Sequence, residues 1–297
     1  SIMLLSEDHL AVQDAVRAYV QDRIAPQAAE WDRSKHFPKA ELRGLAALGC
    51  YGVAVPTEYD GAGLDYLALS IILEEIAAGD GATSTVVSVN NCPVCSILMA
   101  FGNEQQKQRF LKPLARGDML GAFCLTEPHV GSEAGGLKTS AVRDGDHYVL
   151  NGVKQFITSG KNGDLAIVMA VTDKAAGKKG ISAFVVPTDT PGYIVARVED
   201  KMGQPARDTA QILFDNCRVS AANLLGEEGM GLKIALSGLE GGRIGIASQA
   251  VGMARAAFDA ALAYSKERSS FGQPIFQHQA VQFKLADMAT QIEVARQ

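Results

Sequence analysis

The sequence predicts an α+β multidomain protein: an N-terminal helical domain, a central β-sandwich or barrel, and a C-terminal helical bundle. The main observation is that hydrophobic periodicity changes from helical to alternating near residue 120 and back near residue 226. In addition, the composition of 47% hydrophobic and 21% charged residues is typical of a globular chain, and the length of 297 residues alone suggests about two domains. We expect domains at 1–119, 120–226 and 227–297.

The first domain is predicted to be helical. Ser6, followed by Glu7 and Asp8, is a typical helix start, and Val16 and Val20 belong to one apolar face. A short helix is expected near Pro38, followed by a loop at 51–63. Further helices are expected at 65–78, 82–101 and 103–116.

The middle of the chain alternates between apolar and polar residues in short segments. Strands are expected at 122–126, 148–154, 165–172, 182–187, 193–198 and 209–214. Asp144-Gly145, Asn151-Gly152 and Pro191-Gly192 are turn signals. Two long amphipathic helices are expected afterwards, at 231–265 and 277–296.

Composition restricts the function classes. The net charge is −5 with both signs interspersed, which argues against nucleic acid as a partner but permits one anionic pocket. No apolar run approaches the ~20 residues that span a bilayer, so we expect no membrane insertion. Cys92 and Cys95 have redox or zinc spacing, but no second pair completes a metal site, so we expect buried side chains and no metal.

The segment 123–136 is the most informative. Alternating Phe123 and Leu125 lead into a turn with three glycines and the hydroxyls of Thr126 and Ser132. Glycines permit close backbone approach to a ligand, and free N–H groups beside a serine hydroxyl can hold an anion. Taken alone, this segment favours a plain hairpin turn.

Together with other motifs, however, the segment resembles the flavin-binding loop of the acyl-CoA dehydrogenase family. Leu125-Thr126-Glu127-Pro128 is followed by Gly131-Ser132 at the family spacing. The resemblance extends along nearly the whole chain, through Val55-Pro56, Glu58-Tyr59, Gly61-Ala62-Gly63, Asn151-Gly152, Phe156-Ile157-Thr158, Gly180-Ile181-Ser182, Gly229-Met230-Gly231, Gly242-Arg243-Ile244-Gly245 and Phe271-Gly272. The run at Arg243 and the segment 282–288 are most similar to the short-chain, butyryl-type branch. The loop departs from the family pattern at His129, Val130 and Glu133.

The resemblance implies a flavoprotein oxidoreductase of fatty acid β-oxidation. The expected reaction is FAD-dependent α,β-dehydrogenation of a short, possibly branched, acyl-CoA to the trans-2-enoyl-CoA, with electrons passed to electron-transfer flavoprotein. It also implies a homotetramer in the bacterial cytoplasm, or in the mitochondrial matrix after processing. The implied cofactor-binding residues are Phe123, Leu125, Thr126, Gly131, Ser132, Phe156, Thr158, Arg268, Phe271 and Gln279. The last three would reach the FAD of a neighbouring subunit.

The resemblance also places substrate contacts on Ser132 and on the helix at 231–265, where Leu239, Glu240, Gly242 and Arg243 would line the acyl-CoA pocket. Ser132 would otherwise be a turn-capping hydroxyl. Glu240 and Arg243 are three residues apart, so an exposed helix ion pair is the alternative interpretation.

No catalytic residue is expected within these residues. In the main family branches the catalytic glutamate lies beyond the position of Gln297, and Gly242 occupies the alternative position used in the isovaleryl-type branch. Glu240 is an improbable substitute. We therefore expect these residues to be part of a longer enzyme whose C-terminal portion is missing here. A flavin oxidase or monooxygenase on the same fold, and a catalytically dead acyl-CoA-binding homologue, are the alternatives.

Overall fold

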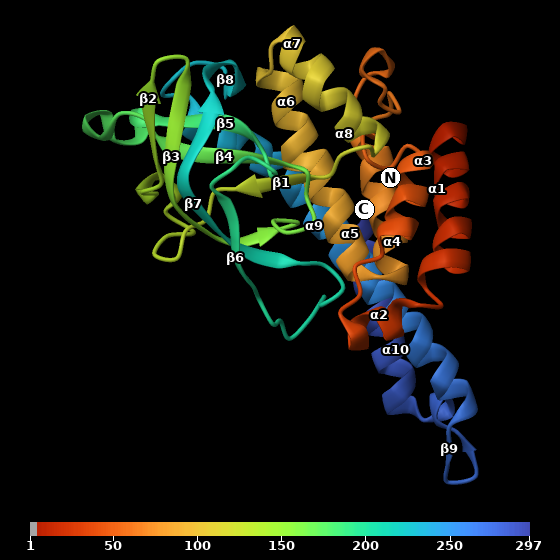
Figure 1. Cartoon of the computed structure of the whole chain (residues 1–297). Coiled ribbons are helices and arrows are strands. Elements are labelled where there is room, and N and C mark those ends of the chain that lie inside the picture. Colours follow the sequence, from red (N-terminus) through yellow and green to blue (C-terminus); the bar gives the residue numbers. More distant parts are fainter. Residues whose placement is uncertain (1–4) are drawn as a thin grey trace.

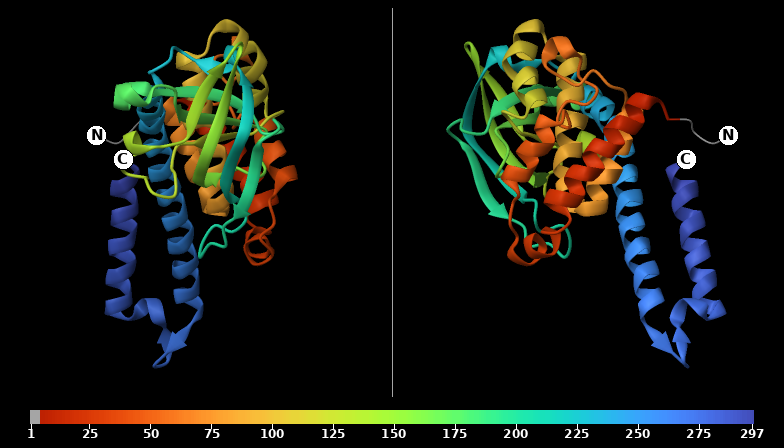
Figure 2. Two further views of the ribbon diagram at one scale, coloured as in Figure 1. Left: turned by 60° about the vertical axis from the view of Figure 1, so that its left-hand side comes forward. Right: turned by 90° about the vertical axis from the view of Figure 1, so that its right-hand side faces the viewer.

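The computed structural model describes residues 5–297. A curved sheet lies against a group of helices, and the last helix extends away from both beside the second half of the helix before it (Figures 1 and 2). The helices of the N-terminal part are α1 (Glu7–Tyr19), α2 (Ala28–Ser34), α3 (Lys39–Ala47), α4 (Tyr66–Gly79), α5 (Gly81–Val89), α6 (Ser96–Phe101), α7 (Glu104–Gln106) and α8 (Lys112–Arg116). The predicted helix start is confirmed, because the Ser6 side chain accepts a hydrogen bond from the His9 amide.

The single helix expected at 82–101 is interrupted. Cys92 has extended backbone angles, φ −137° and ψ 116°, between α5 and α6. Pro93 explains the break, because a proline disfavours helical geometry in the residue before it and cannot donate a backbone hydrogen bond. All five cysteines are buried and free, which confirms the interpretation of Cys92 and Cys95 as buried side chains.

Among the described residues, the stretch Gly81–Phe101 is long and apolar enough to cross a membrane by length and composition. The expectation that no apolar run approaches this length is therefore corrected for this stretch. Within this structure 67% of its apolar window is buried, as in a core helix.

The strands form one eight-stranded sheet in the order β6-β7-β3-β2-β4-β5-β8, with β1 parallel to β4. Their bounds are β1 (Gly121–Cys124), β2 (Ser140–Asp144), β3 (His147–Thr158), β4 (Leu165–Val171), β5 (Ile181–Pro187), β6 (Tyr193–Val198), β7 (Thr209–Ser220) and β8 (Leu224–Leu225). The β2–β3 hairpin turns at Gly145, as predicted. The turn expected at Asn151-Gly152 is wrong: both residues lie within β3, where the register shifts. A Cβ at Gly152 would lie 2.4 Å from the Thr139 hydroxyl oxygen, so glycine permits this close approach.

The sheet has two buried faces. One face buries a core formed by the sheet's own side chains. In this core the ring centroids of Tyr148 and Phe184 lie 4.8 Å apart, and Phe214 belongs to the same cluster. The other face of β4, with Leu165, Ile167 and Met169, packs against the helices. This second core joins the sheet to α6 and α8, and Val89 of α5 packs against it.

The long helix α9 (Gly231–Glu267) crosses both parts. It is followed by a small hairpin, β9 (Ser269–Ser270) and β10 (Gln273–Pro274), and by α10 (Gln279–Arg296). Gly252 lets α9 approach α4, because a Cβ there would lie 2.2 Å from the Glu74 carbonyl oxygen. Buried Glu75 then accepts hydrogen bonds from Arg17 of α1 and Arg255 of α9, which fixes the three helices together.

A buried ion pair holds the segment after β1. The Lys154 ammonium group lies 2.9 Å from Glu127 Oε1 and donates to the Leu125 carbonyl oxygen at 3.1 Å. The Glu127 carboxylate also accepts hydrogen bonds from the backbone amides of Lys138 and Thr139, at 2.7 and 2.9 Å. Burial raises the pKa of Glu127, but the Lys154 charge and these hydrogen bonds outweigh it, so its pKa lies below the ordinary value. The ion pair thus connects three segments: the one after β1, the one before β2, and β3 itself.

We predict that Lys154→Met lowers the free energy of unfolding by about 3–5 kcal/mol, because it leaves the Glu127 carboxylate buried without its counter-charge. Urea denaturation measures this. Lys174→Met, at an exposed lysine, is the matched control and should change stability by less than about 0.5 kcal/mol. Equal stability of the two variants would show that the pair does not anchor this region.

Candidate functional site

A cavity of about 550 Å³ lies where the sheet, α5 and α9 meet. Its walls come from three parts of the chain. They are formed by Thr85, Ser88, Val89, Cys92 and Pro93; by Phe123, Leu125, Thr126, Gly131, Ser132, Ala134, Phe156, Ile157 and Thr158; and by Leu236, Leu239, Gly242, Arg243, Ile246 and Gln249. The cavity is mostly apolar, with a few hydroxyls and one guanidinium, which is typical of small-molecule sites.

The segment after β1 forms one wall. The Gln155 amide donates to the Thr126 carbonyl oxygen at 2.8 Å, and Glu127 and Val130 exchange two backbone hydrogen bonds across a tight turn. Together with the Glu127–Lys154 ion pair, these bonds fix the turn that leads to Gly131 and Ser132. The hydroxyls of Thr126 and Ser132 are therefore held at the cavity by backbone contacts.

Phe156 reaches the cavity through a β-bulge. The register of β3 against β7 shifts between Lys154 and Ile157, and Phe156 has a left-handed backbone with φ +58°. Bulges re-aim side chains, and a non-glycine residue at positive φ is uncommon. Here the ring is 63% exposed although it belongs to a strand. The strained backbone thus presents an aromatic surface to the cavity.

Thr158 ends β3 at the same wall. Its hydroxyl oxygen accepts a hydrogen bond from Arg207 Nη1 at 3.0 Å, and the same nitrogen donates to Thr209 Oγ1 at 2.7 Å. Across the cavity, Thr85 Oγ1 lies 2.7 Å from Gln204 Oε1 and 2.9 Å from Gln249 Oε1. This polar network joins the β6–β7 loop to α5 and α9.

Helix α9 forms the opposite wall. Leu239, Gly242 and Arg243 line the cavity, as predicted from the sequence. Glu240 is exposed and is not among the lining residues. Within the described residues, the lining includes no Asp, Glu or His, so Arg243 and the buried thiol of Cys92 are its ionisable groups. Burial raises the pKa of that thiol, with Tyr66 and Ser96 opposing the shift.

Three predicted cofactor residues lie elsewhere. Arg268, Phe271 and Gln279 belong to the hairpin and helix start at the far end of α9, away from the sheet (Figure 2). Phe271 and Gly272 form the hairpin turn at φ +51° and +77°, and the Phe271 ring is 97% exposed. These residues do not contribute to the cavity of their own chain, and their contact with a neighbouring subunit stays a prediction.

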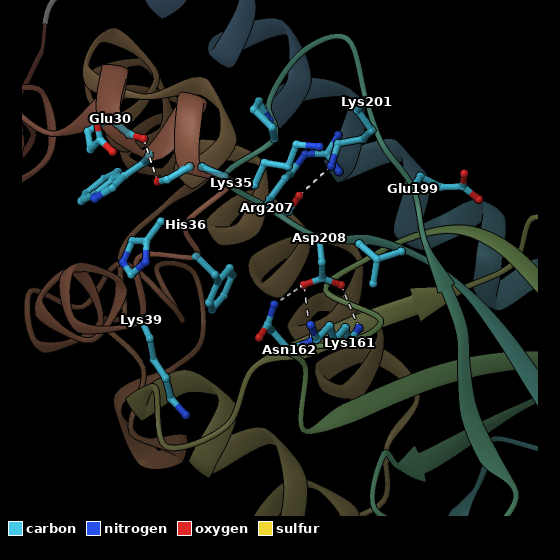
Figure 3. A pocket seen from close by; sticks show the side chains of 16 residues that line it. Glu30, Lys35, His36, Lys39, Lys161, Asn162, Glu199, Lys201, Arg207 and Asp208 are labelled. Carbon is cyan, nitrogen blue, oxygen red and sulfur yellow. Dashed lines mark hydrogen bonds between the residues drawn. The ribbon is translucent and has the colours of Figure 1, made fainter.

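A second cavity, of about 840 Å³, lies between α2–α3 and the loops around Lys161 and Arg207 (Figure 3). Several of its polar groups hold loops in place. Asp208 accepts hydrogen bonds from the Lys161 amide and the Asn162 side chain, and Lys201 donates to the Arg207 carbonyl oxygen. Arg207 lines this cavity and also contacts Thr158 of the first.

Sequence reasoning missed the supporting residues. Glu127 lies in the Leu125–Pro128 motif and Lys154 in the strand expected at 148–154, and a lysine within a predicted strand was a usable signal of a buried pair. Arg207, Gln204 and Gln249 carried no such signal, because their contacts join segments far apart in the sequence.

Models of three domains match the chain: the acyl-CoA dehydrogenase N-terminal domain at residues 6–118, the middle domain at 122–217 and the C-terminal domain at 229–297. The mitochondrial short-chain specific acyl-CoA dehydrogenase of the mouse (Mus musculus) is 46% identical over 292 residues, covering 98% of this chain and 71% of that protein. The structure of butyryl-CoA dehydrogenase from Megasphaera elsdenii is similar with a TM-score of 0.96 at 40% identity, covering 100% of this chain and 78% of that one.

A chain in a structure described as the electron transferring flavoprotein of Acidaminococcus fermentans is also similar, with a TM-score of 0.97 at 43% identity. It covers 100% of this chain and 78% of that one. The three domain models in order, the identities and the fold agree, and the chain belongs to the acyl-CoA dehydrogenase family of oxidoreductases.

Proposed function

We propose that this protein carries out FAD-dependent α,β-dehydrogenation of a short-chain acyl-CoA, giving the trans-2-enoyl-CoA and passing electrons to electron-transfer flavoprotein. One observation supports this most strongly. A single cavity gathers Phe123, Leu125, Thr126, Gly131, Ser132, Phe156 and Thr158, expected at the flavin, with Leu239, Gly242 and Arg243, expected at the substrate. The residues expected at the substrate lie more than a hundred positions after Phe123 and Leu125, so folding brings the two groups together.

The lining fits a flavin. Phe123, Leu125 and Phe156 offer apolar surface for the flat ring, and the hydroxyls of Thr126 and Thr158 can hydrogen-bond to its polar edge. Ser132, beside Gly131, has the chemistry to bind a phosphate oxygen. When bound, FAD supplies the acceptor for the hydride that leaves Cβ of the acyl chain.

The chain's own residues orient the substrate and exclude water. Leu239 and Gly242 offer apolar, open surface on α9, so a short acyl chain can lie between the helix and the sheet. Arg243 is the cation of this wall and would bind or orient an anionic group. Loss of the Cα proton requires a base, and the described lining holds no carboxylate. We propose that a further segment of the protein supplies it, since the matched relatives are longer than this chain.

The named relatives support the proposed substrate and electron acceptor. The mouse relative is named for short chains, and the Megasphaera protein for butyryl-CoA. The Acidaminococcus structure supports electron-transfer flavoprotein as the acceptor. The exposed Phe271, held out by a hairpin turn, supports a homo-oligomer in which this hairpin reaches a partner's FAD.

We predict that butyryl-CoA, added anaerobically to the full native polypeptide with FAD, bleaches the flavin absorbance. Admitting air should then produce peroxide only slowly. Spectrophotometry and a peroxide assay measure both. Rapid peroxide formation would identify an oxidase instead, and binding of butyryl-CoA without bleaching would identify a catalytically dead binding protein.

Arg243→Ala should lower kcat/KM at least tenfold while changing the free energy of unfolding by less than about 0.5 kcal/mol, because its side chain lines the cavity and is exposed. Steady-state kinetics and urea denaturation measure the two effects. Lys233→Ala, at an exposed position of the same helix, is the control. Unchanged kcat/KM in Arg243→Ala would remove this residue from the site.

Arg268→Ala and Phe271→Ala should each reduce FAD retention and weaken the oligomer, because these side chains belong to the exposed hairpin rather than to their own cavity. Flavin content after gel filtration and the oligomer mass report the two effects. Lys266→Ala is the neighbouring control. Full flavin content in both variants would contradict a contact across subunits.

A further inference from the structure

Arg207 stands between the two cavities of the protein. It lies in the loop between β6 and β7 and lines the larger cavity, where Figure 3 shows it beside Lys201 and Asp208. Its Nη1 atom reaches Thr158, which lines the smaller cavity, at 3.0 Å. This guanidinium is therefore one hydrogen bond away from the proposed flavin site.

The direction of this hydrogen bond is fixed by chemistry. A guanidinium has only donors, so Thr158 Oγ1 must be the acceptor. A threonine hydroxyl can accept and donate at once, and none of the hydrogen bonds found among the described residues uses the Thr158 proton. Because Arg207 donates to this oxygen, the hydroxyl proton stays available to a ligand in the cavity that Thr158 lines.

The guanidinium itself is held firmly. Nη1 also donates to Thr209 Oγ1 at 2.7 Å, and Nε donates to Gln204 Oε1 at 3.0 Å. Gln204 has a left-handed backbone with φ +54° and lies against Thr85 of α5. Lys201 donates to the Arg207 carbonyl oxygen at 2.6 Å. The loop is thus tied to both neighbouring elements.

The Arg207 guanidinium forms no ion pair with a carboxylate of the described residues. None of the ion pairs of the described residues includes Arg207, and the neighbouring Asp208 carboxylate is occupied by Lys161 and Asn162. Arg207 is also half-buried, so water screens its positive charge less than it screens the charge of a surface arginine.

We propose that Arg207 is a positioning residue: it aims the Thr158 hydroxyl at the ring of the bound flavin and thereby raises the flavin reduction potential. This inference rests on the proposed function. A reduced flavin carries more negative charge than the oxidised one, so a fixed donor with a cation behind it favours the reduced form. The sequence motifs of the site do not include this residue.

The test uses the full native polypeptide loaded with FAD and measures the midpoint potential by equilibration with a redox dye. Arg207→Met should shift the reduction equilibrium about tenfold toward oxidised flavin, which is ~30 mV for a two-electron couple. Arg197→Met, at an exposed arginine of β6, removes the same charge from the neighbourhood and should leave the potential unchanged. An unchanged potential in Arg207→Met would overturn the proposal.

A double-mutant comparison separates positioning from charge. Thr158→Val should lower the potential by itself, Thr158→Ser should preserve it, and Arg207→Met should add little in the Thr158→Val background. An equal effect of Arg207→Met in both backgrounds would show that only its charge acts, and would overturn the positioning role.

The two Thr158 variants provide a second test if Arg207→Met does not fold. Equal flavin reduction potentials in Thr158→Val and Thr158→Ser would contradict the proposal. Failure of the wild-type protein to bind FAD, or to be reduced by butyryl-CoA, would instead overturn the proposed function on which the inference rests.

Discussion

The site depends on one buried ion pair. Lys154 has no exposed side-chain surface, and its ammonium group is bonded both to the Glu127 carboxylate and to the Leu125 carbonyl oxygen. Two charges are costly to bury unless each is paired and hydrogen-bonded, and the backbone amides of Lys138 and Thr139 complete the Glu127 shell. Leu125 and Glu127 lie at the start of the loop that carries Thr126 and Ser132, and Lys138 and Thr139 lie at its end. The ion pair therefore fixes both ends of this loop. The geometry of the cavity wall is thus set by an interaction that does not face the cavity.

The second requirement is close packing of α9 on the rest of the chain. At Gly252 and Gly245 a side chain would collide with the Glu74 carbonyl oxygen and the Ser88 hydroxyl oxygen, at 2.2 and 2.3 Å. Arg255 of α9 binds Glu74 and Glu75 of α4 at the same interface. Together they place Leu239, Gly242 and Arg243 opposite the sheet. The site therefore arises only when the helical and sheet domains are joined.

The order of helices, strands and helices could be read from the sequence, because hydrophobic periodicity is a local property. The flavin-wall residues Phe123 to Thr158 could be named because they recur in motifs. The β3 bulge at Gly152 could not be anticipated, because it accompanies the close approach of Thr139, which lies just before β2. In the same way, the contact of Arg207 with Thr158 joins the β6–β7 loop to the end of β3, 49 positions away in the sequence. Long-range contacts of this kind leave no periodic or motif signal in one sequence.

We propose that a flavin ring lies between the end of β3 and helix α9. A crystal structure of the full native polypeptide with FAD and a non-reactive thioether analogue of butyryl-CoA would test this placement. We expect the isoalloxazine ring against Phe156 and Thr158, with the analogue between that ring and Leu239. A flavin bound elsewhere, for example in the larger cavity lined by Lys161 and Asp208, would refute the placement.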